Sequence, residues 1–158
     1  MTEPERLIKC LAASSKTVAA AESCTAGLVA DLLARTPGAS QVFWGSFVSY
    51  TAAAKITMLG LDQGLVERCG AVSAETALAM ARAALERSSA DMAVSVTGLA
   101  GPLGDGGSAP VGTVWIGTAA RGKEPRARKF HYTGSRDEVR MSAALQAVKE
   151  LLQLFDCT

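Results

Sequence analysis

The sequence is short of the residues on which many active sites depend. It has a single histidine, His131, and no asparagine. A metal site with two histidine ligands is therefore excluded, as are a Cys-His-Asn hydrolase triad and an N-glycosylation acceptor. A Ser-His-Asp triad would need His131, which lies in the basic, polar segment RARKFHYTG, where a histidine is usually a solvated surface residue. Lysines remain as the candidate general bases.

The four cysteines form no recognisable metal or redox motif. Cys10, Cys24, Cys69 and Cys157 lie far apart and none forms a CxxC pair, which excludes a zinc ribbon and a thioredoxin-type motif. The N-terminal sequence MTEPERLIKC is charged where a signal peptide needs an apolar stretch. No apolar run reaches the roughly 18 residues of a membrane span. We therefore expect a cytoplasmic location, reduced thiols and no membrane partner.

The composition is that of one globular domain. The 158 residues are 49% hydrophobic and 20% charged, which is enough to bury a sizeable core, and we expect a single domain over residues 1–158. The 16 basic residues nearly balance the 15 acidic ones. Because nucleic-acid arms and polybasic membrane tethers depend on concentrated positive charge, neither is expected.

Hydrophobic periodicity predicts strands that alternate with helices. Strands are expected over 17–22, 41–50, 91–97 and 111–120, with an edge strand over 126–132. Helices are expected after Thr2, after the turn 23–27, over 51–60, from Ser73 and over 135–155. This alternation predicts an α/β fold, a three-layer α/β/α sandwich with a mostly parallel or mixed sheet, whose strand order the sequence does not give.

Apolar spacing also predicts which side chains are buried. On the first helix they are Leu7, Ile8 and Leu11, and on the helix from Ser73 they are Ala77, Leu78, Ala81, Ala84 and Leu85. On the last helix the expected stripe is Met141, Ala144, Leu145, Val148, Leu151, Leu152 and Phe155.

The strand-to-helix junction 23–27 is the most informative local feature. In open α/β sheets, ligands collect at the carboxyl ends of strands, where the next helix offers free N–H groups. Ser23 would be well placed there as a nucleophile, since the same N–H groups can stabilise an oxyanion or hold a phosphate. The alternative is that Ser23 or Thr25 only caps the helix.

Lys55 is the candidate base for this serine. It is the only charged residue between Arg35 and Asp62, and burial would lower its pKa enough for it to act as a neutral base. Tyr50, at the end of a predicted strand, is placed to hydrogen-bond between the two. An exposed lysine on a small helix and an ordinary core-edge tyrosine are the alternative interpretations.

Two further segments are candidate ligand sites. The glycine-rich run from Gly98 to Pro110 matches neither a Walker motif nor GxGxxG before a helix, but its glycines permit close approach of backbone to a ligand. A flexible hairpin connection explains it equally. Arg136 and Arg140 lie four apart on one helix face and either clamp a phosphate or face solvent.

Taken together, these segments resemble one known family, the C-terminal domain of the competence/damage-inducible CinA proteins. The segments that carry the resemblance are AAESCTAGLVA at 20–30, GSFVSYTAAAK at 45–55, GAVSAETALAMA at 70–81, SVTGLAGPLGDGGSAPVGTVWIG at 95–117 and GSRDEVR at 134–140. They follow one another over nearly the whole chain.

The resemblance implies an amidohydrolase that converts nicotinamide mononucleotide (NMN) and water to nicotinic acid mononucleotide and ammonia. It implies a serine, a lysine and a tyrosine as catalytic residues, with no metal or other cofactor. Those roles fall on Ser23, Lys55 and Tyr50. It also implies a homodimer or higher homo-oligomer. Substrate binding is expected from Thr25, Ala26, Gly27, Thr97, Gly98, Gly101 and Arg140.

The sequence departs from the family pattern at two places. The family often reads Ser-Asn-Glu-Ala-Lys where this chain has Thr51 to Lys55, with Ala52 and Ala53 in place of Asn and Glu. The serine motif usually ends in Thr-Gly-Gly, whereas Ala26 stands here before Gly27. These departures motivate an alternative, a nucleotide-binding or regulatory module that has lost turnover.

Cys24 is a rival nucleophile, because a thiolate at a helix N-terminus has a lowered pKa. Adjacent residues at a strand end point in opposite directions, so Ser23 and Cys24 are not expected to share the role.

Overall fold

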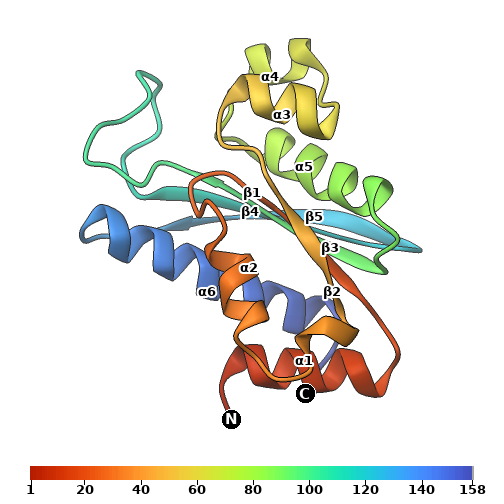
Figure 1. The fold of residues 1–158 in the computed structure, drawn as a ribbon. Coiled ribbons are helices and arrows are strands. Elements are labelled where there is room, and N and C mark those ends of the chain that lie inside the picture. Colours follow the sequence, from red (N-terminus) through yellow and green to blue (C-terminus); the bar gives the residue numbers. More distant parts are fainter. Residues whose placement is uncertain (158) are drawn as a thin grey trace.

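The fold is a five-stranded mixed sheet between two layers of helices (Figure 1). The computed structural model describes residues 1–157, so Thr158, the last residue of the expected domain, lies outside the described residues. The strand order is β2-β1-β3-β4-β5, with β1 parallel to β2 and β3, and with β4 antiparallel to β3 and β5. The strands are β1 (Val18–Glu22), β2 (Phe43–Val48), β3 (Met92–Gly98), β4 (Thr113–Ala120) and β5 (Lys123–His131). The predicted α/β sandwich with a mixed sheet is confirmed.

Three helices cover each face of the sheet (Figure 1). One face carries α1 (Glu3–Ala13), α2 (Leu28–Ala34) and α6 (Arg136–Leu154), and a short 3-10 helix (Ala39–Gln41) precedes β2. The other carries α3 (Ala52–Leu59), α4 (Gln63–Cys69) and α5 (Ala74–Arg87). On that second face α5 packs directly on the sheet, while α3 and α4 pack against α5.

Local capping signals explain why most helix boundaries match the prediction. Thr2 and Ser135 form capping boxes at the starts of α1 and α6, and the Ser73 hydroxyl accepts the N–H of Thr76 at the start of α5. Gly60 ends α3 in the left-handed conformation, at φ 69°. The helix α4 is not among the predicted elements, because it has seven residues, a single buried side chain, Val66, and therefore no apolar stripe.

The buried stripe of the last helix differs from the prediction. Met141 is 40% exposed, whereas Val139 and small side chains at Ala143 and Ala147 face the sheet. On α5, Leu78 and Leu85 are only half-buried, because alanines make the closest approach to the sheet there too. The predicted stripe of α1 is confirmed, with Leu7, Ile8 and Leu11 all buried.

The two edge strands differ in character. β5 is the predicted edge strand and is largely polar and exposed, whereas β2 carries no charge and exposes Trp44 and Val48. The expected homo-oligomer stays a prediction. Among residues 1–157, no helix has the length and apolar character that crossing a membrane requires.

The expectation of reduced thiols is wrong for one pair of cysteines. Cys10 on α1 is bonded to Cys157 near the C-terminus, 147 positions later, and Figure 1 places both chain ends beside α1. The packing of α1 against α6 brings these residues together, which sequence spacing alone does not reveal. Cys24 and Cys69 are free thiols.

Candidate functional site

The candidate site lies where the parallel strands β1, β2 and β3 end. Ser23 directly follows β1, Tyr50 comes two residues after β2, and Gly98 closes β3. The carboxyl ends of parallel strands meet at one edge of a sheet, so these residues converge although they are far apart in sequence.

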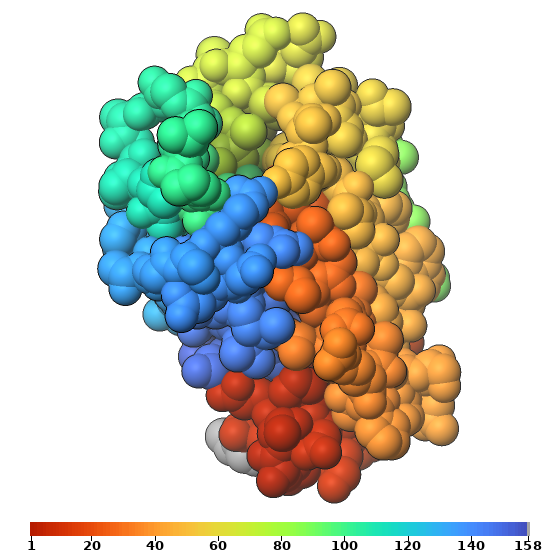
Figure 2. Space-filling model, turned by 60° about the vertical axis from the view of Figure 1, so that its left-hand side comes forward, coloured from red at the N-terminus to blue at the C-terminus, as the bar shows by residue number. Residues whose placement is uncertain are grey.

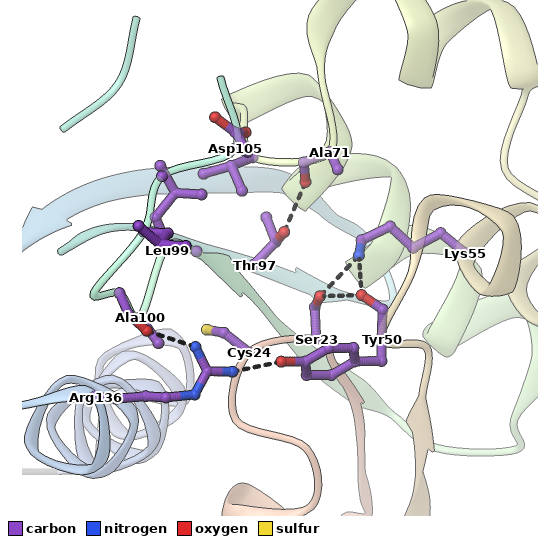
Figure 3. A pocket seen from close by; sticks show the side chains of 15 residues that line it. Ser23, Cys24, Tyr50, Lys55, Ala71, Thr97, Leu99, Ala100, Asp105 and Arg136 are labelled. Atoms are coloured by element: carbon purple, nitrogen blue, oxygen red, sulfur yellow. Dashed lines mark hydrogen bonds between the residues drawn. The ribbon is translucent and has the colours of Figure 1, made fainter. Parts of the chain in front are cut away.

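Ser23 and Lys55 form a buried hydrogen-bonded pair (Figure 3). The Lys55 Nζ lies 2.8 Å from the Ser23 Oγ, 3.2 Å from the Ser49 carbonyl oxygen and 3.3 Å from the Tyr50 carbonyl oxygen. The Ser23 hydroxyl in turn lies 3.0 Å from that Tyr50 carbonyl oxygen. Both side chains are buried, with Lys55 only 1% exposed.

The surroundings of Lys55 make its neutral form more accessible at pH 7 than that of an exposed lysine. Burial lowers the pKa of the ammonium from 10.5 to about 8. Within residues 1–157, no ion pair involves Lys55, and its hydrogen-bond acceptors are neutral oxygens. About a tenth of the molecules therefore carry a neutral lysine at pH 7, which is a base directly beside the serine hydroxyl.

The first turn of α3 places Lys55 without help from the positions that depart from the family pattern. The Thr51 hydroxyl caps the helix by accepting the N–H of Ala54 at 3.0 Å. Ala52 and Ala53 are exposed, whereas Lys55 points inward to backbone carbonyls. The loss of Asn and Glu at these two positions therefore leaves the orientation of the lysine intact.

Tyr50 contacts the pair through its backbone rather than through its hydroxyl. Its carbonyl oxygen accepts from both Ser23 and Lys55, but its side chain is 48% exposed and turns toward α6. There the Tyr50 hydroxyl accepts a hydrogen bond of 2.6 Å from Arg136 (Figure 3). Tyr50 thus hydrogen-bonds to both serine and lysine, but through its main-chain oxygen and not through its side chain.

Arg136, and not Arg140, reaches the site. Besides Tyr50, Arg136 donates to the Gly101 carbonyl oxygen at 2.7 Å, and no ion pair within residues 1–157 neutralises it. Arg140 is one helical turn further along and donates instead to the carbonyl oxygens of Cys24 and Thr25. The predicted substrate contact of Arg140 is therefore replaced by a structural role, the anchoring of α6 to the turn 23–27.

The turn 23–27 also differs from the expectation. The helix begins at Leu28, directly after the turn as predicted, but its first N–H groups are already occupied by the carboxylate of Glu22. The predicted binding residues Thr25, Ala26 and Gly27 do not line the cavity described below. Ala26 and Gly27 have positive φ angles of 46° and 100° and form the turn.

Ser23 and Lys55 open into a cavity of about 250 Å³. Its walls come from the turn after β1, the β2–α3 link, the segment before α5, the glycine-rich loop and the start of α6. Figure 2 shows these segments around a hollow, with the green loop on one side, the yellow α3 region on the other and the blue start of α6 below. The cavity therefore combines a serine–lysine pair with an arginine that forms no ion pair within the described part of the chain.

The predicted residues of β3 and the glycine-rich loop do line the cavity. The Thr97 hydroxyl donates to the Ala71 carbonyl oxygen at 2.6 Å, so it holds the wall together (Figure 3). A Cβ on Gly98 would lie only 2.9 Å from the Thr113 carbonyl oxygen. Strands β3 and β4 therefore approach too closely here for any residue other than glycine. Gly101 has a positive φ of 88°, and its carbonyl oxygen accepts a hydrogen bond from Arg136.

Sequence reasoning missed several lining residues because they carry no motif of their own. Asp105 and Leu103 lie in the glycine-rich loop, and Ala71 and Val72 precede α5. Cys24 lines the cavity as well, but burial raises the pKa of its thiol to about 11, which keeps it protonated. Within residues 1–157 no group of three or more histidine, cysteine, aspartate or glutamate residues is arranged to hold a metal.

The fold and site together define an α/β protein with a buried serine–lysine pair at the carboxyl edge of a mixed sheet. The family to which it belongs follows from comparison with known proteins. The family model of the CinA C-terminal domain matches residues 2–155, and the chain belongs to that family.

Individual relatives support the assignment. A CinA-like protein of Akkermansia muciniphila is 44% identical over 149 residues, which are 94% of this chain and 36% of that protein. A putative competence-damage inducible protein of Levilactobacillus brevis is 46% identical over 129 residues, 82% of this chain and 31% of that protein. The chain thus spans about a third of the length of these curated relatives.

Solved structures of similar length share the fold. A CinA superfamily protein from Escherichia coli has 34% identity and a TM-score of 0.92, covering 96% of this chain and 88% of its own. A competence/damage inducible protein from Agrobacterium tumefaciens has 38% identity and a TM-score of 0.89, covering 98% and 96%. The family and its fold are therefore established for this chain.

Proposed function

We propose that this domain is a metal-independent serine amidohydrolase that converts NMN and water to nicotinic acid mononucleotide and ammonia. The observation that carries the proposal is the 2.8 Å contact between the Lys55 amine and the Ser23 hydroxyl in a buried setting that lowers the lysine pKa to about 8. A neutral lysine in this position can take the serine proton as the hydroxyl oxygen attacks a carbonyl carbon.

The reaction then needs two steps on the carboxamide. The Ser23 oxygen bonds to the carboxamide carbon while its proton passes to Lys55, and the tetrahedral intermediate expels ammonia after Lys55 returns that proton to the nitrogen. Water hydrolyses the resulting ester in the same way, with Lys55 again as base. The Tyr50 carbonyl oxygen accepts hydrogen bonds from both Ser23 and Lys55 and so keeps the two side chains next to each other.

The backbone of the turn supplies candidate oxyanion donors. The N–H groups of Cys24 and Thr25 have no hydrogen-bond acceptor among residues 1–157, whereas the Ser23 N–H is bound to Val96. Donors fixed at the nucleophile stabilise the negative charge that develops on the carboxamide oxygen. We assign this role to the Cys24 N–H, because Cys24 lines the cavity, in place of the α2 N-terminus expected from the sequence.

Arg136 is the proposed contact for the 5′-phosphate, because it is a cation that lines the cavity and has no ion-pair partner among residues 1–157. We expect Arg136→Ala to raise the KM for NMN about 10- to 100-fold with a smaller change in kcat, since a charged hydrogen bond contributes about 1.5–3 kcal/mol. Arg140→Ala, which removes an anchor outside the cavity, should lower stability instead. Steady-state kinetics of the two variants separate these roles.

Ammonia release from NMN by the purified protein, with EDTA present, tests the proposal. We expect release by the wild type and its loss in Ser23→Ala. Release by both proteins would move the nucleophile elsewhere. Tight NMN binding by calorimetry without ammonia release would favour the alternative of a binding module. A wild type that neither binds NMN nor releases ammonia from it would overturn both hypotheses.

A further inference from the structure

Glu22 directly precedes the nucleophile and faces the opposite side of the sheet. Successive side chains of a strand alternate, so Ser23 points toward α3 and Lys55 while Glu22 points toward α2. The exposed fraction of Glu22 is 0%. A glutamate buried this completely must have its charge satisfied inside the protein.

Four donors converge on the Glu22 carboxylate. One oxygen accepts the N–H groups of Gly27 and Val29 at 3.2 and 2.8 Å, and the other accepts the Ala30 N–H at 3.2 Å and the Ser46 hydroxyl at 2.8 Å. No lysine or arginine among residues 1–157 forms an ion pair with it. The carboxylate is thus held by the N-terminal N–H groups of α2 and by one hydroxyl of β2, as a bound anion would be.

These contacts fix both ends of the turn that carries Ser23. Glu22 belongs to β1 and its partners belong to α2 and β2, so the carboxylate ties the start and the end of the segment 23–27 to one point. The turn is closed by its own hydrogen bond from the Ala26 N–H to the Ser23 carbonyl oxygen, but Ala26 adopts a left-handed φ of 46° that disfavours alanine. Contacts from outside therefore help to hold the turn: Arg140 binds its carbonyl oxygens, and Glu22 fixes its two ends.

We infer that Glu22 is a positioning residue: as an internal anion at the N-terminus of α2, it holds the turn so that the Ser23 hydroxyl and the neighbouring N–H groups keep the geometry of a reactive site. This inference deepens the proposed function and rests on it for the identity of the substrate. It also assigns the N-terminus of α2 to the protein's own carboxylate, which leaves the substrate phosphate to Arg136.

The test uses the reactivity of Ser23 toward a small fluorophosphonate, alongside ammonia release from NMN. In the labelling reaction the serine oxygen bonds to phosphorus, fluoride leaves, and the proton passes to Lys55. For Glu22→Gln we expect the labelling rate and kcat to fall together about 100-fold with KM within about threefold, because misplacing a reacting group by an ångström costs about that factor. The pH dependence of labelling should stay that of the wild type, since Glu22 is not the base.

Glu150→Gln is the matched control, because Glu150 is the other buried glutamate and lies on α6 beside Arg128. It should lower the melting temperature and leave labelling and kcat unchanged. If Glu22→Gln is folded and keeps both rates within threefold of the wild type, the inference is wrong. If Glu22→Gln does not fold, Ser46→Ala takes its place, with an expected fivefold fall in labelling, and unchanged labelling overturns the inference.

The labelling assay separates this inference from the proposed function. If the wild type is labelled at Ser23 but releases no ammonia, the NMN reaction is contradicted. The labelling rates of wild type and Glu22→Gln then still test whether Glu22 positions Ser23. A wild type that neither releases ammonia nor is labelled at Ser23 would overturn both.

Discussion

Two buried charges lie in different parts of the molecule and differ in what surrounds them. Lys55, at the candidate site, contacts one hydroxyl and two backbone carbonyls and has no ion-pair partner among residues 1–157. Glu150, on α6, is bonded to Arg128 at 2.9 Å and to Gln146 at 2.8 Å. A buried charge without a counter-charge destabilises the folded state more than a paired one. The difference indicates that the region around Lys55 is built for reactivity and the region around Glu150 for stability.

The largest expected effect is that of Lys55→Met. Ammonia release should fall at least about a thousandfold, because Lys55 is the one basic side chain bonded to Ser23 among residues 1–157. The free energy of unfolding at pH 7 should nevertheless rise by about 1–3 kcal/mol, since the buried ammonium is replaced by an apolar side chain of similar length. Glu150→Gln should instead leave ammonia release unchanged and lower the free energy of unfolding by about 1–2 kcal/mol. Denaturant unfolding and ammonia assays on both variants measure these effects. A clear loss of stability in Lys55→Met would contradict the view that Lys55 is kept for reactivity at the expense of stability.

The next effect concerns the bond between the chain ends. Cys10→Ser should lower the free energy of unfolding by about 4 kcal/mol, because the disulfide closes a loop of 147 positions in the unfolded chain. Activity at a temperature where the variant stays folded should be unchanged, since the bond lies among α1, α6 and the C-terminus. Cys69→Ser, which removes a free thiol, is the control for substitution itself. Equal melting temperatures of wild type and Cys10→Ser would contradict the expectation.

The smallest effect is at the turn beside the serine. Ala26 has a φ of 46°, a conformation that glycine adopts without strain, so Ala26→Gly should raise the free energy of unfolding by about 0.5–1 kcal/mol. Ala30→Gly, a few residues later inside α2, should lower it by a similar amount, because glycine in a helix interior is unfavourable. Thermal unfolding of the pair measures both signs, and two changes of the same sign would show that the turn is not strained.

The fold could be predicted from the sequence wherever the signal is local. The side chains of Thr2, Ser73 and Ser135 cap the helices that follow them, so these helix starts could be predicted. The helix α4 has no apolar stripe and was not predicted. The strand order and the disulfide depend on contacts between segments far apart in the chain, which no local pattern contains.

The candidate site could be predicted only in part. Ser23 and Lys55 were identified through the resemblance, and the structure brings them to 2.8 Å. Two features could not be predicted because they depend on how α6 packs against the sheet. They are the direction of the Tyr50 side chain and the fact that Arg136, not Arg140, reaches the cavity. Helical spacing places both arginines on one face, but it does not say which of them reaches the cavity.

The pH dependence of ammonia release tests the central claim most directly. The base must be neutral, so activity should rise with pH as Lys55 loses its proton, by roughly fiftyfold between pH 6 and pH 8, and level off above about pH 8. Stability should follow in the same direction between about pH 8 and 10.5, because the unfolded chain there binds the proton that folded Lys55 has lost. A profile that is flat from pH 6 to 9, or that rises only near pH 10.5, would contradict a buried lysine as the base of this site.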